Sequence, residues 1–302
     1  TEIYTLSLHD ALPISYDRHV LWHNVVDPEQ NYGLLANEVV TPSAPDATYQ
    51  GKDALESLSV VADGSYLNLS LALSRGIDFS KEELLIGLDT LSRELGQMRW
   101  PVGNLPTSSG LEFLVRISGP DRAELLVIPT YNAAVSKFST VKLWDGIFER
   151  IRPLVNGKVT TKDGRFIPEK YFDASALRYG AFDESGNLWR MEGNRIFIRL
   201  PWTLINVTDP SSLKVLQDSR TGYFNPQRDA LKVVPTDGFV FSALLWDRSA
   251  RKLSGSLQAN PLRPYLWNGW EEVPRYIERY KKSYYILQEA WAEPRKAESV
   301  FR

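Results

Sequence analysis

The chain has 302 residues, of which 43% are hydrophobic, enough for one large domain or two ordinary ones with a sizeable core. Its 35 Lys and Arg and 37 Asp and Glu residues give a formal net charge of −2, so nothing in the charge balance indicates nucleic acid or an anionic membrane as a partner. No apolar run approaches the roughly 18 residues that a membrane span needs. The absence of cysteine excludes disulfides and thiolate metal sites.

The first fifteen residues, TEIYTLSLHDALPIS, resemble the in-frame translation of a widely used sequencing-library adapter. They lack the basic start and continuous apolar core of a signal peptide. We therefore expect residues 1–15 to be an artefact joined to a gene fragment whose true amino terminus is missing. Residues 16–51 end in a Pro-rich stretch from residue 41 onward, and we interpret them as a residual upstream segment followed by a linker.

Residues 58–73, LSVVADGSYLNLSLAL, predict a β-hairpin around the turn Asp63-Gly64. The leucines at positions 67, 69, 71 and 73 alternate with residues of the opposite face, which is the period of a sheet with one buried side. A strand ending at Asp89 is favoured for residues 83–90, although the residues before it also resemble the start of a helix.

Further strands follow in chain order. Residues 110–118 and 123–128 predict a second hairpin, in which the alternating residues Leu111, Phe113, Val115 and Ile117 point inward. Residues 129–171 are expected to be loops with short elements. Four more strands are predicted over residues 177–182, 188–191, 195–200 and 237–246, the last with Phe239, Phe241, Ala243 and Leu245 on one face.

These elements predict a mainly antiparallel β-sandwich of jelly-roll type over residues 52–273, with long loops. The tail differs, because apolar residues recur at spacings of three and four from position 277 to position 291. This pattern predicts an amphipathic helix over residues 274–293 that packs on the sandwich.

Several of these segments resemble family 9-like carbohydrate-binding modules: VVADGSYLNLSLAL, LLIGLDTLSRELG, GLEFLVRI and RIFIRLPWTLINVTDPSS. The stretches HNVVDPEQNYGLLA and WNGWEEVPRYIERYKKSYYILQEAWA resemble the carboxy-terminal portion of large bacterial proteins that often carry an upstream glycosidase-like barrel. The resemblance implies a β-sandwich, a polysaccharide or oligosaccharide ligand, a missing upstream domain of the same protein as partner, and an extracellular or cell-envelope location. The aromatic pair that clamps sugar in such modules has no counterpart that can be aligned here.

A sugar site needs an exposed aromatic plane beside groups that share hydrogen bonds with hydroxyls. The nine tryptophans supply candidates wherever one stands beside polar or turn residues, whereas Trp202 and Trp246 are expected in the core. The candidate ligand-binding residues are Trp100, Trp144, Trp189, Trp267 and Trp270.

No catalytic residues are predicted. The carboxylate pairs Asp89 with Glu112 and Asp183 with Glu184 are interpreted as turn or surface groups. His19 and His23 are four residues apart but lack the HExxH pattern and a third ligand, so no metal site is predicted. No cofactor is expected, although loop aspartates could hold a structural Ca²⁺ ion.

Three functions remain open. The leading one is a non-catalytic carbohydrate-binding or accessory domain of a carbohydrate-active bacterial protein. The alternatives are a structural module that braces a missing upstream glycosidase-like barrel, and a wall of the active site of that enzyme. Whether this fragment itself has enzymatic activity stays open, with the balance against it.

Overall fold

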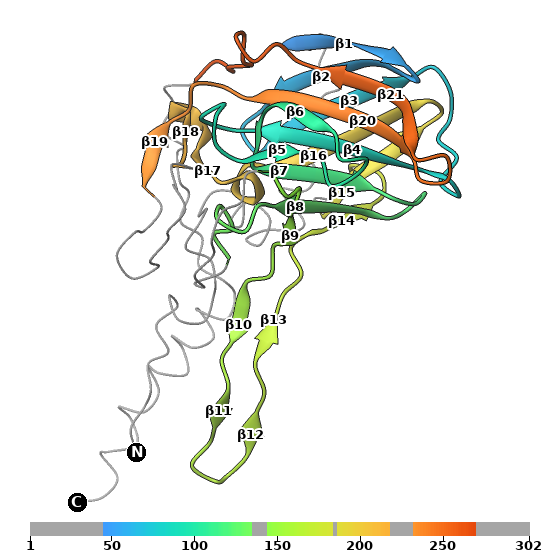
Figure 1. Ribbon diagram of the computed structural model, residues 1–302. Coiled ribbons are helices and arrows are strands. Elements are labelled where there is room, and N and C mark those ends of the chain that lie inside the picture. The colour runs from blue at the N-terminus through green and yellow to red at the C-terminus, as the bar shows by residue number, and fades with distance from the viewer. Residues whose placement is uncertain (1–44, 135–143, 184–185, 218–231, 270–302) are drawn as a thin grey trace, which may run out of the picture.

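The computed structural model describes residues 45–134, 144–183, 186–217 and 232–269. These residues form a mainly β structure whose large sheet closes on itself (Figure 1). The sheet runs in the order β14-β15-β16-β3-β2-β1-β21-β20-β4-β7-β8, and β8 pairs back with β14 to make a closed barrel of 11 strands. The barrel strands are β1 (Ala47–Asp53), β2 (Leu55–Ala62), β3 (Tyr66–Leu73), β4 (Glu82–Asp89), β7 (Phe113–Ile117), β8 (Ala123–Val127), β14 (Ala176–Tyr179), β15 (Asn187–Glu192), β16 (Arg195–Pro201), β20 (Val240–Asp247) and β21 (Lys252–Gln258).

The predicted β-sandwich is therefore wrong, and the seam between β8 and β14 is the finding that overturns it. Leu177 lies opposite Ala123 in an antiparallel register, and the Leu125 amide donates to the Ser175 carbonyl at 2.8 Å. On its other side β14 pairs in parallel with β15. Alternating strands with one buried face fit a sandwich and a barrel equally well, so the sequence pattern did not distinguish the two.

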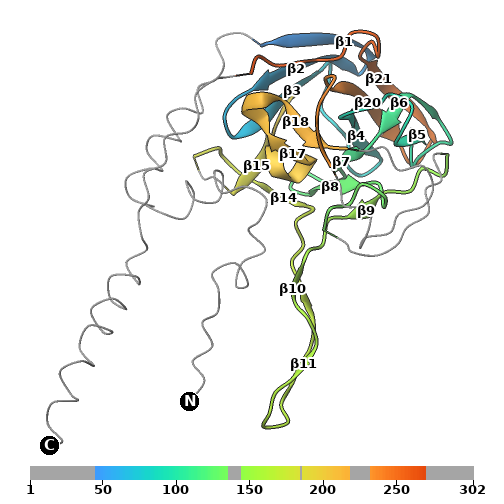
Figure 2. The ribbon, with the colours of Figure 1, turned by 90° about the vertical axis from the view of Figure 1, so that its left-hand side faces the viewer.

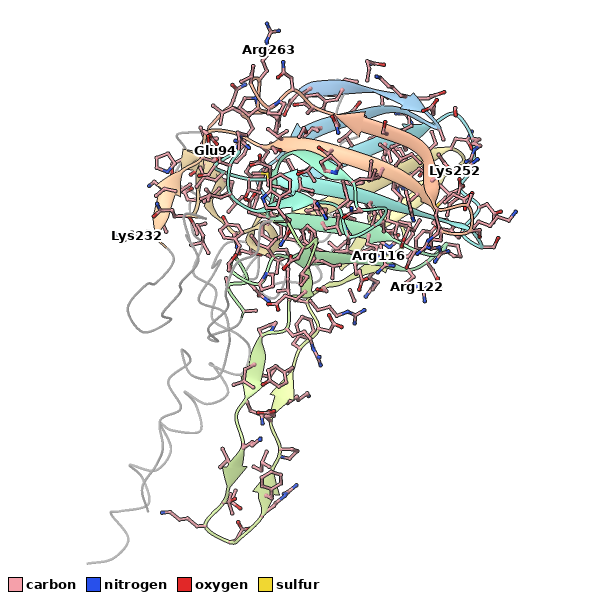
Figure 3. All side chains as sticks on the ribbon, in the orientation of Figure 1. Glu94, Arg116, Arg122, Lys232, Lys252 and Arg263 are labelled. Atoms are coloured by element: carbon pink, nitrogen blue, oxygen red, sulfur yellow. The ribbon has the colours of Figure 1, made fainter. Side chains whose placement is uncertain are left out.

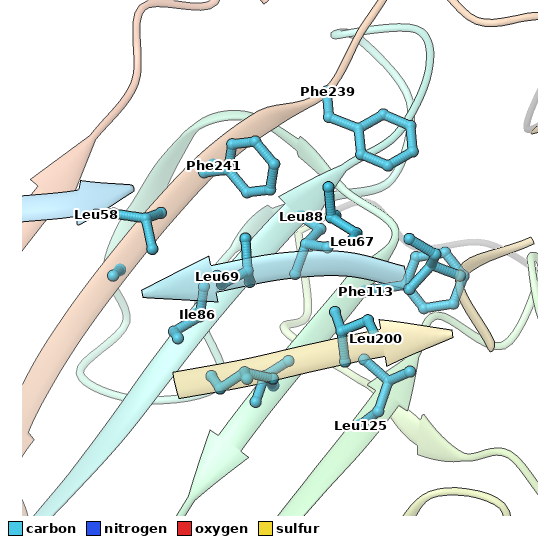
Figure 4. Close-up of a cluster of buried hydrophobic side chains, with 14 of the residues drawn as sticks. Leu58, Leu67, Leu69, Ile86, Leu88, Phe113, Leu125, Leu200, Phe239 and Phe241 are labelled. Carbon is cyan, nitrogen blue, oxygen red and sulfur yellow. The ribbon is translucent and has the colours of Figure 1, made fainter. Parts of the chain in front are cut away.

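The inward faces of the barrel strands form the main hydrophobic core (Figure 4). The predicted hairpin of β2 and β3 is confirmed, and Leu67, Leu69, Leu71 and Leu73 are all buried in this core. The predicted face of β20 is confirmed as well, with Phe239, Phe241, Ala243 and Leu245 in the same cluster. Asp63 closes the hairpin turn by accepting from the amides of Ser65 and Tyr66, each at 2.7 Å.

A short hairpin of β5 (Gln97–Arg99) and β6 (Pro106–Leu111) covers part of the outer surface of the barrel. Beneath it lies a second, smaller cluster of buried side chains, namely Leu85, Trp100, Leu111, Leu114 and Leu244. Leu111 was expected to share the inward face of Phe113, but the strand is interrupted between them at Glu112. Because Glu112 interrupts the strand, the alternation of faces is broken there, and the Leu111 side chain lies on the outer side of the barrel wall.

A three-stranded sheet of β17 (Val207–Asp209), β18 (Lys214–Leu216) and β19 (Val233–Pro235) lies at one end of the barrel (Figure 1). The 3-10 turn η1 (Trp202–Ile205) connects β16 to β17, and a second 3-10 turn, η2 (Pro210–Ser212), connects β17 to β18. Trp202 is fully buried and Trp246 nearly so, which confirms both as core residues.

A long two-stranded arm projects away from the barrel in both views (Figures 1 and 2). It leaves the barrel after β9 (Glu149–Arg150), which pairs with β8. The arm consists of β10 (Leu154–Asn156) paired with β13 (Lys170–Tyr171), and β11 (Val159–Thr160) paired with β12 (Phe166–Ile167). Residues 129–171, expected as loops with short elements, thus contain this extended ribbon.

The described residues contain no α-helix, and the amphipathic helix predicted for residues 274–293 lies outside them, as do residues 1–15. The predicted linker over residues 41–51 is wrong from Ala47 onward, because β1 begins there and pairs with β2 and β21. Within the described ranges, no helix has both the length and the apolar character that a bilayer span requires.

Candidate functional site

The five tryptophans predicted to bind a ligand differ in solvent exposure. Trp100, Trp189 and Trp267 are 2%, 0% and 3% exposed, so none of them offers a ring face to a ligand. Trp144 is 58% exposed, and Trp270 lies outside the described residues. The three buried rings correct the prediction, and the reason is that a large apolar ring is usually worth more as core packing than as surface.

The buried rings have structural roles. Trp189 lies at the barrel seam, where its Nε1 donates to the Leu177 carbonyl at 3.1 Å. Trp267 packs on Trp202 with ring centroids 4.8 Å apart, and its Nε1 donates to the Pro210 carbonyl at 2.8 Å. Trp267 thereby links Trp202, at the end of the barrel, to the turn η2 between β17 and β18 of the small sheet.

Trp100 and Trp144 are the two predicted residues that the fold brings into one region. The loop carrying Trp144 folds against the backbone of Trp100, and Gly146 makes the contact with φ +67°. A β-carbon at Gly146 would stand 2.8 Å from the Trp100 carbonyl oxygen. Only glycine combines that positive φ with so close an approach at little cost.

The neighbouring carboxylate of Asp145 is held in a fixed orientation by Gln97, a buried residue of β5. Gln97 Nε2 donates to Asp145 Oδ1 at 2.9 Å, and the Gly146 amide donates to Gln97 Oε1 at 3.0 Å. The Ile147 amide adds a second hydrogen bond to Asp145 Oδ1 at 3.2 Å. Sequence reasoning missed Gln97, because its partners lie almost fifty residues further along the chain.

We call Gln97, Trp144, Asp145 and Ile147 the Trp144 patch. It presents an exposed indole and an exposed isoleucine side chain beside a carboxylate whose Oδ1 is already engaged. Such a patch could place the apolar face of a ring-shaped ligand on the indole while Asp145 Oδ2 accepts a hydrogen bond from a hydroxyl. Gln97 itself is buried and positions the patch rather than contacting a ligand.

The carboxylates Asp89 and Glu112 lie close to this region but are closed to solvent. Both are fully buried, which corrects their interpretation as turn or surface groups. Glu112 Oε2 accepts from the Thr90 amide at 2.7 Å, and Asp89 is paired with Arg93. A β-carbon at Gly96 would come within 2.7 Å of Glu112 Oε1, so the segment after β4 packs tightly over this carboxylate.

Burial raises the pKa of Asp89 to about 7, although the neighbouring Arg93 guanidinium opposes that shift. Arg93 also pairs with Asp237 at 2.5 Å and donates to the Gly238 carbonyl, so it ties β4 to the segment that precedes β20. A carboxylate with a raised pKa is a common property of catalytic acids. Here the group has no exposed surface from which to reach a substrate, and its partners are structural.

The remaining candidate residues, a carboxylate pair and a histidine pair, do not form a catalytic or metal site among the described residues. Asp183 is exposed, while Glu184 and the histidine pair at 19 and 23 lie outside the described residues. Within the four described ranges, no group of three or more His, Asp or Glu side chains is placed to hold a metal ion. The predicted structural Ca²⁺ site stays a prediction.

Comparison of the chain with protein-family models, with curated proteins and with solved structures found no match.

Proposed function

We propose that this chain is a non-catalytic carbohydrate-binding or accessory domain and that the Trp144 patch is its binding site. The observation that carries the proposal is the exposed Trp144 ring beside Asp145, whose carboxylate is held by Gln97 at 2.9 Å. Sugar rings offer apolar C–H faces and hydroxyl groups together, and an indole beside a carboxylate matches both.

Two further points support this proposal. The sequence segments that resemble family 9-like carbohydrate-binding modules include β3, β4, β7 and β16, which form much of the barrel wall. The sandwich that this resemblance implied is not the architecture observed, so the proposal depends on the patch rather than on the fold. Asp89 and Glu112 are both fully buried, which fits their having no role as a glycosidase carboxylate pair.

Affinity electrophoresis of the full chain through gels containing soluble polysaccharides tests the proposal. We expect retardation by at least one polysaccharide, and we expect Trp144→Ala to weaken it by about tenfold or more, since a lost stacking contact is worth about 1.4 kcal/mol or more. Trp144→Phe should retain part of the binding. Leu262→Ala, which alters a side chain that is 89% exposed in the turn after β21, is the matched control.

Three results would contradict all or part of the proposal. A folded chain that no polysaccharide retards has no carbohydrate-binding function of this kind. Retardation that is identical for the native chain and Trp144→Ala would remove the Trp144 patch as the site. Release of reducing sugar by the purified chain would instead contradict the non-catalytic part of the proposal.

A further inference from the structure

Within the part of the chain that the structure describes, the arm of residues 152–172 is anchored to the barrel at its base alone. Arg150 bridges Glu124 of β8 and Asp173 at the end of the arm, at 2.8 and 2.7 Å. Beyond this point no other described element lies beside the ribbon in either view (Figures 1 and 2). A two-stranded ribbon without a sheet or helix to pack on is marginally stable in water, so the arm has the properties of a segment that is completed by a partner.

The apolar side chains of the arm lie on both of its faces. Successive residues of a strand point to opposite faces, and the arm carries two adjacent apolar residues at three places. Phe166 and Phe172 are each 61% exposed, and the other members of the three pairs are also exposed. Figure 3 shows side chains projecting to both sides of the ribbon. The three pairs are Leu154 with Val155, Phe166 with Ile167, and Tyr171 with Phe172.

The charge of the arm differs in sign from that of the rest of the chain. The arm contains five basic and two acidic residues, a net charge of +3, whereas the described residues outside the arm contain 18 basic and 20 acidic residues, a net charge of −2. Attraction between opposite charges of this size favours and orients association. The charged residues of the arm are Arg152, Lys158, Lys162, Asp163, Arg165, Glu169 and Lys170.

We propose that the arm docks on the body of a second copy of this chain, and that two copies exchange arms in a dimer. The arm has about 20 residues, close to the roughly 20–30 that each partner contributes to an interface of standard size. The net charge of +3 on the arm is opposite in sign to the net charge of −2 on the described body of the other copy, whereas pairing of one arm with another would bring together two charges of +3. Exchange between identical chains is a low-cost route to a closed dimer.

A lipid bilayer fits the arm less well than a protein surface does. An amphipathic element that lies on a bilayer needs a single apolar face, but this ribbon has apolar side chains on two. Deeper insertion would bury the unpaired backbone groups of both ribbon edges in hydrocarbon, together with the charged tip around Lys162 and Arg165.

Sedimentation velocity of the full chain tests the proposal. We expect a species of twice the 34.3 kDa chain mass that dissociates as salt rises, since screening weakens the attraction between arm and body. Phe166→Ser combined with Phe172→Ser should raise the dissociation constant by about tenfold or more. Leu262→Ser, which changes an apolar side chain that is even more exposed and lies in the turn after β21, should leave it unchanged. Both variants change exposed side chains, so the barrel should fold in each.

A cross-linking experiment locates the contact. The chain contains no cysteine, so Thr160→Cys on the exposed arm can carry a single photoreactive group. Irradiation of labelled chains mixed with isotopically heavy, unlabelled chains should join the arm to barrel residues of the heavy copy. The proposal is overturned if the chain is monomeric at about 100 µM and low salt, a concentration at which even weak dimers form. It is also overturned by cross-links only between arms, by a dimer that the arm variants do not weaken, or by a monomer that cosediments with phosphatidylserine vesicles through the arm.

Discussion

Gly146 approaches Trp100 so closely that a β-carbon on the glycine would lie 2.8 Å from the Trp100 carbonyl oxygen. This contact places the loop of Trp144 against the β5–β6 hairpin and brings Asp145 within hydrogen-bonding distance of Gln97. The exposed aromatic ring of the proposed site is therefore positioned by a backbone contact that depends on one glycine. The hairpin that receives it is fixed in turn by the buried Trp100 ring in the outer hydrophobic cluster.

Substitution of Gly146 by alanine should both destabilise the chain and disturb the patch. The φ of +67° is unfavourable for alanine, and the added methyl group would collide with backbone that has little room to move. We expect the free energy of unfolding to fall by about 1–3 kcal/mol, measured by chemical denaturation. Gly157→Ala is the matched control, because nothing lies within 4 Å of its β-carbon position. Equal stability of the two variants would contradict the contact.

The closed barrel predicts slow hydrogen exchange at its seam. The Leu125 amide is bonded to the Ser175 carbonyl, and β14 and β8 are paired at Leu177 and Ala123. Amides that take part in this pairing should exchange as slowly as those of the central pair β3 and β16. Trp189→Phe, which removes the bond from Nε1 to the Leu177 carbonyl, should accelerate exchange at the seam more than elsewhere. Rapid exchange along β14 in the native chain would indicate an open sheet.

Local alternation explains why the strands could be predicted from the sequence. Leu67, Leu69 and Leu71 repeat every second residue, and that period survives in any architecture that buries one face of the strand. The strand β1 was missed because its side chains are only half buried or exposed, and its sequence follows proline-rich residues. Closure of the barrel depends on pairing between β8 and β14, which are far apart in the chain, and no local pattern encodes that partner choice.

The candidate site was predictable only in part for a similar reason. Residue type marks Trp144 and Trp189 equally, yet one ring is exposed and the other lies in the barrel core. The difference arises from tertiary position, not from the neighbouring sequence. Gln97 carried no signal at all, since an isolated glutamine shows its role only when Asp145 and Gly146 are brought to it. Asp89 and Glu112 likewise resemble surface carboxylates until the segment after β4 covers them.

Acid should weaken the chain through Glu82. This carboxylate is buried and forms two hydrogen bonds with Arg75, which lower its pKa to about 2. Its folded-state pKa lies below the unfolded value of 4.5, so the stabilisation is present above pH 4.5 and is lost as the pH falls toward 2. Because Arg75 is half exposed, we expect a contribution of about 1–2 kcal/mol. Glu82→Gln should remove this acid dependence from urea unfolding measured across that range, and an unchanged dependence would contradict it.

Ionisation of Asp89 should destabilise the folded chain as the pH rises, which is opposite to the effect of Glu82. The reason is that burial raises the pKa of Asp89 to about 7 from 3.8. The folded chain then binds a proton that the unfolded chain has already released, so the free energy of unfolding should fall as the pH rises from about 4 to about 7. For a fully buried carboxyl the decrease could reach about 4 kcal/mol.

The variant Asp89→Asn tests this pH dependence. It keeps the side-chain shape but cannot ionise, while Arg93 retains Asp237 and the Gly238 carbonyl as partners. Subtracting the stability curve of this variant from that of the native chain should leave a downward slope across this pH range. A parallel curve for Asp89→Asn would show that the carboxyl of Asp89 does not resist ionisation in the folded barrel.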